Sequence, residues 1–156
     1  MNPEPEIGLY QSRLGSEQFI RFCSNYNTQI LLIEGFFEER NFLRHTVIGL
    51  GRALAARGLG CFIPDLPGSG ESPIVLDNVT FQDWRDAVAD SARWLAETSG
   101  CLPHIAAIRS GALLDDAATG ASWWRFAPVD GSDLLRQGLD LRPECFYVDS
   151  VGRHGG

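Results

Sequence analysis

The chain has 156 residues, a length that suits one domain burying about two thirds of its unfolded surface. Thirteen basic side chains, all of them arginines, stand against twenty acidic ones, and the net charge at pH 7 is −7. Such a chain does not attract nucleic acid or anionic membranes, and no run reaches the roughly eighteen apolar residues that span a bilayer. We therefore expect no nucleic-acid partner and no membrane-spanning segment.

The N-terminus and the cysteines bear on the compartment. Residues 1–6 are acidic and lack the basic and apolar regions of a signal peptide. The cysteines, Cys23, Cys61, Cys101 and Cys145, are scattered, with no C-x-x-C pair and no nearby histidine cluster. They are typical of small core residues in a reducing compartment. The sequence thus predicts a cytoplasmic protein with no metal and no cofactor.

The first half of the chain alternates between strand and helix patterns. Residues 7–13 and 18–23 are short, partly alternating stretches that predict a hairpin. The continuous apolar run 30–33 is typical of a strand buried on both faces of a parallel sheet. A loop is expected at 36–41, and apolar residues at helical spacing predict a helix over 41–57. Asn41 is its expected N-cap, and Gly58 is expected to close its far end.

The second half continues the alternation. The apolar run 61–64 predicts a strand that leads into the loop 65–72, where Gly68 and Gly70 make a tight turn. A long helix is predicted from about Thr80 to Thr98. The remaining expected elements are a strand at 104–108, a helix to about 119, a strand at 123–127 and a short helix at 132–141. This order predicts an α/β fold with a mostly parallel sheet and helices on both faces.

A polar pair interrupts the apolar segment 104–114 and predicts a sharp strand-to-helix turn. Such a turn carries the nucleophile of a G-x-S-x-G elbow, and it needs small neighbours two residues on either side. With Ala107 and Gly111 in the small positions, Arg109 takes the nucleophile position. A guanidinium is always protonated and cannot attack a carbonyl.

A register shifted by one residue makes Ser110 the nucleophile instead. Its neighbours two residues away are then Ile108 and Ala112. A β-branched isoleucine fits a crowded position poorly, so the register with Arg109 at the apex fits better. The sequence thus leaves two alternatives open: Arg109 at the nucleophile position, or Ser110 as a catalytic nucleophile.

Four segments occur in the order and at the spacing of α/β-hydrolases: the strand ending at Gly35, the Asp-x-x-Gly-x-Gly-x-Ser loop 65–72, the helix that carries Trp84, and the elbow 107–111. More closely, the chain resembles the second hydrolase-like family associated with the exosortase A system over roughly residues 30–142. The segments that carry this resemblance are 36–41, 53–58, 65–72, 84–86 and 109–114. That family accompanies bacterial protein-sorting and exopolysaccharide gene clusters, and its members tend to have Arg at the same elbow position. The resemblance implies that strand 30–34 lies between strands 60–64 and 104–108.

The resemblance also assigns site residues. The backbone N–H groups of Ser110 and of Phe36 or Phe37 would form the oxyanion hole, although the two phenylalanines fit simple packing equally well. The side chain of Asp65 fits ordering of the loop better than direct catalysis. Arg109 fits an ion pair with one of two glutamates, Glu38 or Glu39, or else an anion site for an external ligand.

Two departures from the hydrolase pattern concern the end of the chain. A complete α/β-hydrolase has two more strands, which carry the acidic residue and the histidine of the triad. The histidines here, His45, His104 and His154, do not follow a late strand. We expect one incomplete domain over 1–142, truncated after about the sixth strand, and a divergent, poorly ordered tail at 143–156.

Three functions are therefore considered. The first is an exosortase-associated, hydrolase-like protein with Arg109 at the nucleophile position and weak or no hydrolase activity. The second is a serine esterase or acyl hydrolase that uses Ser110. The third is a non-catalytic protein that binds an anionic glycan or lipid intermediate. An edge strand at 123–127 also predicts a homodimer, because unpaired strand edges associate.

Overall fold

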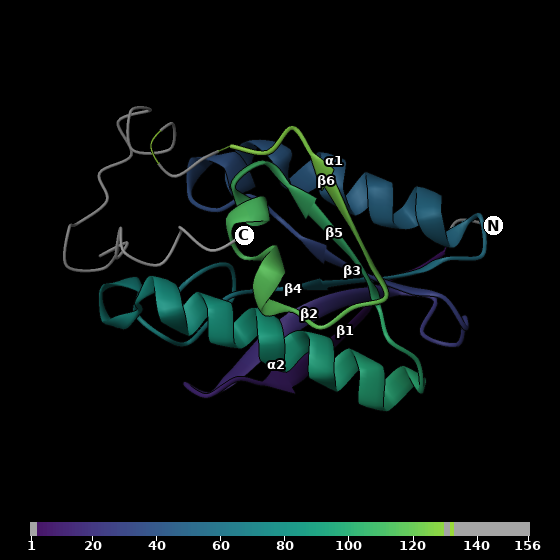
Figure 1. The fold of residues 1–156 in the computed structure, drawn as a ribbon, viewed down its shortest axis with the longest axis horizontal. Helices are drawn as coiled ribbons and strands as arrows, with labels where there is room; N and C mark the ends of the chain where they lie inside the picture. Colours follow the sequence, from purple (N-terminus) through teal and green to yellow (C-terminus); the bar gives the residue numbers. More distant parts are fainter. Residues whose placement is uncertain (1–2, 130–131, 133–156) are drawn as a thin grey trace.

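The computed structural model describes residues 3–129 and Ser132, and it contains one sheet of six strands in the order β1-β2-β4-β3-β5-β6 (Figure 1). The strands are β1 (Glu6–Gln11), β2 (Ser16–Phe22), β3 (Gln29–Ile33), β4 (Gly60–Pro64), β5 (His104–Ile108) and β6 (Ser122–Phe126). The helices are α1 (Glu38–Ala55) and α2 (Phe81–Ser99), with short 3-10 helices η1 (Leu76–Asn78), η2 (Arg109–Leu113) and η3 (Asp115–Ala117).

The centre of the sheet is parallel, as predicted. β3 lies between β4 and β5, with Ile30 opposite Cys61 on one side and His104 on the other. β5 also pairs with β6 in parallel. The predicted hairpin is confirmed: β1 and β2 pair antiparallel, and β2 joins the edge of β4 antiparallel. The flanking order of β3 expected from the hydrolase resemblance is therefore confirmed.

Helices cover both faces of the sheet because the buried strands alternate their side chains with a period of two. Leu31 and Ile33 of β3 belong to one core cluster, which contains the apolar face of α2. Leu32, between them, points to the opposite face and packs in the cluster that contains Val47 and Ala55 of α1. Figure 1 shows α1 and α2 on opposite sides of the strands. The continuous apolar run in the sequence follows from this burial on both faces.

The two long helices differ in how well their starts were predicted. α2 begins where expected, and Thr80 forms a capping box with Asp83. α1 begins at Glu38, three residues before the predicted start, so Asn41 lies inside its first turn and is not the N-cap. The N-cap is Phe37, which has φ 58° and makes no capping hydrogen bond with its side chain. Glu38 and Glu39 in the first turn favour this earlier start, because carboxylates stabilise the positive end of a helix.

The helix predicted from the elbow to about residue 119 is wrong. The segment forms two short 3-10 helices, η2 and η3, separated by Leu114. Asp115 explains the break: Arg125 of β6 donates to both of its carboxylate oxygens, at 2.6 and 2.8 Å. Trp123 of the same strand donates its indole N–H to the Asp115 carbonyl at 3.1 Å. These contacts hold the chain close to β6 and use a carbonyl that a continuing helix would need.

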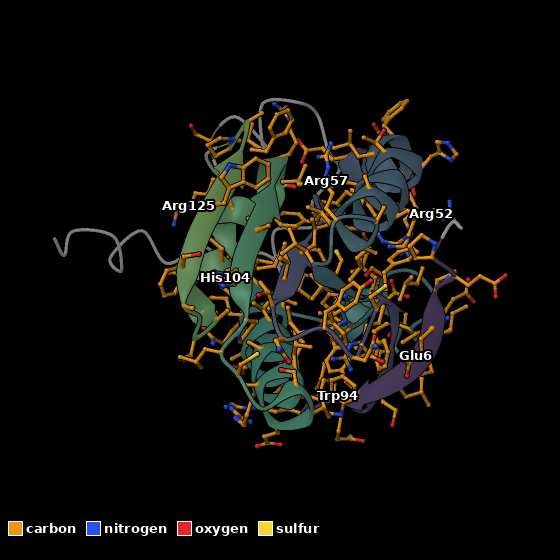
Figure 2. The ribbon with its side chains drawn as sticks, turned by 90° about the vertical axis from the view of Figure 1, so that its right-hand side faces the viewer. Glu6, Arg52, Arg57, Trp94, His104 and Arg125 are labelled. Atoms are coloured by element: carbon orange, nitrogen blue, oxygen red, sulfur yellow. The ribbon has the colours of Figure 1, made fainter. Side chains whose placement is uncertain are left out.

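β6 lies at one edge of the described sheet, and β1 lies at the other (Figure 2). Trp123, Trp124 and Phe126 are about half exposed, at 48%, 54% and 56%. No other described strand pairs with the outer edge of β6. The homodimer expected from such an edge stays a prediction. Among the described residues no helix combines the length and apolar character needed to cross a membrane.

The cysteines are core residues only in part. Cys61 is buried, and burial raises the pKa of its thiol to about 12. Cys23 and Cys101 are half-buried and free, so the prediction of core positions is wrong for them. Cys145, the predicted helix 132–141 apart from Ser132, and the predicted tail 143–156 lie outside the described residues.

Candidate functional site

The residues singled out from the sequence gather at one edge of the sheet. β3, β4 and β5 are parallel, so the segments that follow Ile33, Pro64 and Ile108 leave the sheet on the same side. The first segment leads into α1, the second is the glycine-rich loop, and the third is the turn at Arg109. This is the edge at which open α/β sheets bind ligands.

The turn after β5 places Arg109 in a strained conformation. Arg109 directly follows the last residue of the strand and has φ 54°, which is uncommon for a residue with a side chain. Gly111 packs so closely that a Cβ atom there would lie 2.5 Å from the Ile33 carbonyl oxygen and 2.6 Å from that of Glu34. Ala107, on the other side of the turn, is fully buried. Small residues thus stand two positions before and two positions after Arg109.

Ser110 is fully buried, and both its hydroxyl and its backbone N–H are hydrogen-bonded. Its hydroxyl donates to Glu39 Oε2 at 2.5 Å and accepts a hydrogen bond from the Phe36 N–H at 2.9 Å. Its backbone N–H donates to the same Glu39 oxygen at 3.0 Å. The N–H groups of Phe36 and Ser110, expected as oxyanion donors, are therefore both used inside the protein. The Phe36 ring packs against Phe37 and Trp84, so the packing expected for these phenylalanines is present too.

Glu39 also forms the ion pair that the sequence favoured for Arg109. Its Oε1 lies 3.5 Å from Arg109 Nε, and this oxygen receives no hydrogen bond. The Glu39 side chain is 11% exposed, whereas that of Arg109 is 36% exposed. The Glu39 carboxylate is thus hydrogen-bonded through Oε2, whereas Oε1 makes only the longer contact with Arg109.

Asp65 is hydrogen-bonded across the glycine-rich loop. Its Oδ2 accepts the Glu71 N–H at 3.2 Å, which closes the loop across six residues. Gly68 and Gly70 have φ 76° and 56°, the left-handed region in which glycine is the least strained residue. A Cβ on Gly70 would lie 2.5 Å from Asp65 Oδ2, so the carboxylate fills the space that a side chain would need.

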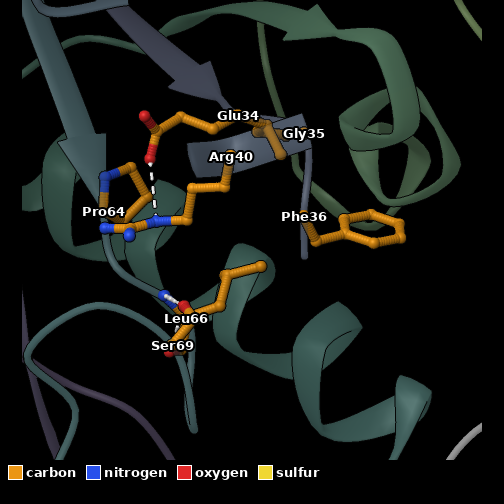
Figure 3. A pocket seen from close by; sticks show the side chains of 8 residues that line it. Glu34, Gly35, Phe36, Arg40, Pro64, Leu66 and Ser69 are labelled. Atoms are coloured by element: carbon orange, nitrogen blue, oxygen red, sulfur yellow. Dashed lines mark hydrogen bonds and ion pairs between the residues drawn. The ribbon is translucent and has the colours of Figure 1, made fainter. Parts of the chain in front are cut away.

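Two arginines of α1 bind this aspartate to a second buried carboxylate, an arrangement that the sequence did not reveal. Arg40 contacts Asp65 at 2.9 Å and Glu34 at 3.4 Å, and Arg44 contacts the same two residues at 3.6 and 2.6 Å. Burial raises the pKa of the Glu34 carboxyl, and Arg44 and Arg40 oppose that shift. Figure 3 shows Arg40 reaching Glu34 beside Pro64. The cavity here holds about 10 Å³, roughly the space for one water molecule.

A larger cavity, of about 310 Å³, opens between the start of α1 and the glycine-rich loop. Its wall contains the apolar residues Phe37, Leu76 and Trp84, and on the polar side Arg40 and Asn41. This volume is at the lower end of the range found for small-molecule sites. Arg109 and Ser110 are not among the residues that line it.

The described histidines do not reach the elbow. His45 is exposed on α1, as expected for a surface residue. His104 is the first residue of β5, at the opposite end of the strand from the elbow, and its Nδ1 lies 2.7 Å from the Ser122 hydroxyl. His154 lies outside the described residues. Within residues 3–129 and Ser132, no group of three or more His, Cys, Asp or Glu is placed to hold a metal ion.

Solved structures similar to this fold come from α/β-hydrolase-like proteins. An α/β serine hydrolase without a lid from Xanthomonas campestris aligns with a TM-score of 0.64 and 14% identity, over 82% of this chain and 63% of that chain. An α/β serine hydrolase homologue from Coxiella burnetii gives 0.64 and 18%, over 79% and 62%. A putative α/β-hydrolase from Agrobacterium tumefaciens gives 0.62 and 13%, over 83% and 65%.

These similarities identify the fold: the chain has the α/β-hydrolase architecture. The chain spans somewhat less than two thirds of the length of each of these three proteins. No family model matches the sequence. No curated protein matches it either.

A second feature that sequence reasoning missed is the double contact between Glu39 and Ser110. The pair of glutamates after Phe37 was recognised as a partner for Arg109, but the hydrogen bonds to Ser110 depend on where α1 begins. A start at Asn41 would have left Glu39 in a loop. The acidic pair directly after a strand and two phenylalanines was the available signal, because such residues prefer a first helical turn.

Proposed function

We propose that this chain is a hydrolase-like protein that does not hydrolyse esters, of the type associated with the exosortase A system, and that its elbow holds an anionic group. One observation carries the proposal: the residue at the strained turn is Arg109, and the neighbouring Ser110 hydroxyl is buried and bound to Glu39. An arginine cannot be acylated as a serine is, since its guanidinium stays protonated. The exosortase association rests on the resemblance of the segments between residues 30 and 142.

The electrostatics of the elbow support an anion in this place. The Ser110 N–H and the Arg109 guanidinium converge on one carboxylate. In a hydrolase an oxyanion would form only during the reaction, whereas here the Glu39 carboxylate already accepts the hydrogen bond from the Ser110 N–H. The donors therefore serve binding rather than turnover.

Ester turnover tests the proposal. Wild-type protein and Ser110→Ala are compared with p-nitrophenyl acetate and butyrate between pH 6 and 9, beside an active serine esterase as a positive control. The expected result is equal rates for wild type and variant, no higher than the rate of heat-denatured protein. A wild-type rate that falls at least about a hundredfold in Ser110→Ala, the scale of nucleophile catalysis with a base, would contradict it.

A second function, acyl hydrolysis by Ser110, is favoured by one contact. Glu39 Oε2 lies 2.5 Å from Ser110 Oγ, the distance expected between a nucleophile and its general base. On this hypothesis Glu39→Gln abolishes turnover, because an amide cannot take the proton. The buried hydroxyl and the Phe36 N–H that binds it oppose this function, since the serine offers no free approach to a substrate.

A further inference from the structure

We propose that the elbow is a binding site for a small molecule that bears a carboxylate, and that Glu39 is a built-in occupant which such a ligand displaces. The inference rests on the proposed non-hydrolytic function and names the chemical class that the elbow takes. The site consists of four groups: the backbone N–H and the hydroxyl of Ser110, the Arg109 guanidinium, and the space above Gly35.

The first argument is that the site is shaped around a carboxylate. A Cβ atom on Gly35 would lie 2.8 Å from Glu39 Oε2 and 3.3 Å from Ser110 Oγ. Any larger residue there would push the carboxylate off its donors. The missing side chain at Gly35 thus makes the space in which a carboxylate meets the Ser110 N–H.

The second argument is that Glu39 fits this site incompletely. One of its oxygens takes both hydrogen bonds from Ser110, while the other is buried, receives no hydrogen bond and lies 3.5 Å from Arg109 Nε. Arginine binds carboxylates best through two parallel hydrogen bonds. Glu39 is tethered to the first turn of α1 and makes no such pair, whereas a free carboxylate has no tether and can orient both oxygens toward its donors.

The third argument is access. The Arg109 side chain is 36% exposed, so a ligand in solution reaches the guanidinium without any movement of the sheet. Glu39 is itself 11% exposed and lies in the first turn of α1, so a change of its side-chain conformation is enough for the carboxylate to leave. A ligand carboxylate then exchanges for an internal one, and no charge is left buried without a partner.

Acetate rescue of a truncated Glu39 tests the inference. Glu39→Ala removes the atoms that acetate contains, and the midpoint of thermal unfolding is followed against sodium acetate at constant ionic strength, with chloride as the balancing anion. The midpoint of Glu39→Ala is expected to rise with acetate and to saturate, because a ligand that binds only the folded state stabilises it. Wild type is expected to need at least about tenfold more acetate, because Glu39 holds the site closed for most of the time.

Three matched variants define the site. Glu38→Ala removes the same charge from the same helical turn. Glu38 is exposed and makes no side-chain hydrogen bond or ion pair within the described part of the chain, so this variant should show no response to acetate. Glu39→Gln keeps the site filled with a neutral group and should not respond either. Glu39→Ala with Arg109→Ala should weaken the acetate response at least about tenfold relative to Glu39→Ala alone, because a charge-assisted contact is lost.

The outcomes separate this inference from the proposed function. An acetate response of Glu39→Ala no larger than that of Glu38→Ala overturns the inference. It does not affect the proposed function, in which Ser110 is catalytically inactive. If Glu39→Ala is unfolded in chloride, recovery of its near-ultraviolet circular dichroism in acetate becomes the readout. An equal recovery in phosphate overturns the inference, as does no recovery in acetate. Hydrolysis that depends on Ser110 overturns the proposed function whatever acetate does.

Discussion

Two carboxylates beside arginines, Asp65 and Glu39, illustrate how differently the same pairing is used within one edge of the sheet. Asp65 is 3% exposed, and both of its oxygens are engaged, one by Arg40 at 2.9 Å and one by the Glu71 N–H at 3.2 Å. Glu39 accepts both of its hydrogen bonds at one oxygen, and its cationic partner Arg109 is 36% exposed.

The difference separates a structural pair from the proposed binding site. Removing one partner of a buried, fully bonded pair leaves an uncompensated charge, which makes the Asp65 cluster part of the fold. A pair whose cation faces solvent contributes little to stability, so Arg109 is available for another partner. The ion pairs of Asp65 therefore hold the glycine-rich loop in place. At the elbow, by contrast, the Glu39 carboxylate occupies the space beside Arg109 without contributing much to stability.

The largest effect is expected for Asp65→Ala. The substitution leaves Arg40 and Arg44 with Glu34 alone, and it frees the Glu71 N–H. We expect the free energy of unfolding, measured in urea, to fall by about 3–5 kcal/mol. Asp86→Ala, which removes a surface pair with the mostly exposed Arg13, should cost less than about 1 kcal/mol. Equal losses in the two variants would show that the Asp65 pairs contribute no more to stability than a surface ion pair does.

Gly111→Ala tests the packing that holds the elbow. The added methyl group would lie 2.5 Å from the carbonyl oxygen of Ile33, the last residue of β3, and 2.6 Å from that of Glu34, which follows it. Neither backbone atom can move freely. We expect unfolding to become easier by about 1–3 kcal/mol. Gly49→Ala in α1 meets nothing within 4 Å and should stabilise the protein by about 0.5–1 kcal/mol. A neutral Gly111→Ala would show that the elbow is looser than the structure indicates.

Glu17 extends the contrast to a buried carboxylate that has no arginine partner in the described part of the chain. It is 0% exposed on β2, and burial raises its pKa from the ordinary 4.5, while the Ser72 hydroxyl opposes that shift. The folded state holds this proton more tightly than the unfolded state does, so the contribution to stability is complete below pH 4.5 and is lost as the pH rises through the raised pKa.

Glu17→Gln should therefore stabilise the protein at pH 8 by about 1 kcal/mol, because a charge no longer has to be buried. The gain in the unfolding free energy should shrink toward zero at pH 4. Glu97→Gln, at an exposed position of α2, serves as the control and should change stability at neither pH. A gain that is independent of pH would mean that the Glu17 charge is not its cause.

The smallest effect is expected for Arg109→Ala. Because the guanidinium is partly exposed and lies 3.5 Å from Glu39, its loss should cost at most about 1 kcal/mol. Arg40→Ala is the counterpart in the Asp65 cluster, where the side chain is 18% exposed and serves two buried carboxylates, and it should cost several times more. Thermal unfolding of the two variants under the same conditions measures the ratio. Equal losses of stability in the two variants would mean that Arg109 stabilises the fold as much as Arg40 does.

The arrangement of the sheet could be predicted because its signals are local and periodic. The apolar runs at 30–33 and 61–64 and the Thr80 capping box lie within a few residues of chain and specify buried strands and a helix start. The start of α1 could not be predicted in the same way. Phe37 at its N-cap supplies no side-chain hydrogen bond, so the sequence carries no capping signal there.

The residues of the candidate site could be predicted from the sequence, but the hydrogen bonds between them could not. Arg109, Ser110 and a glutamate of the pair 38–39 could be named because turn geometry and charge each favour particular residue types. The bond from Ser110 to Glu39, however, joins residues 71 positions apart. It exists because β3 and β5 are neighbours and Gly35 leaves room, which are tertiary facts. The same holds for Asp115, whose pairing with Arg125 stops the helix expected after the elbow.

The most direct measurement is the intact mass of the wild-type protein after incubation with an excess of a fluorophosphonate probe at pH 8. A buried Ser110 bound to Glu39, beside an arginine at the turn, should give no mass increase over hours, as Ser110→Ala does, while an active serine esterase is labelled completely. Stoichiometric labelling of the wild-type protein that disappears in Ser110→Ala would show a working nucleophile and contradict a filled, non-hydrolytic elbow.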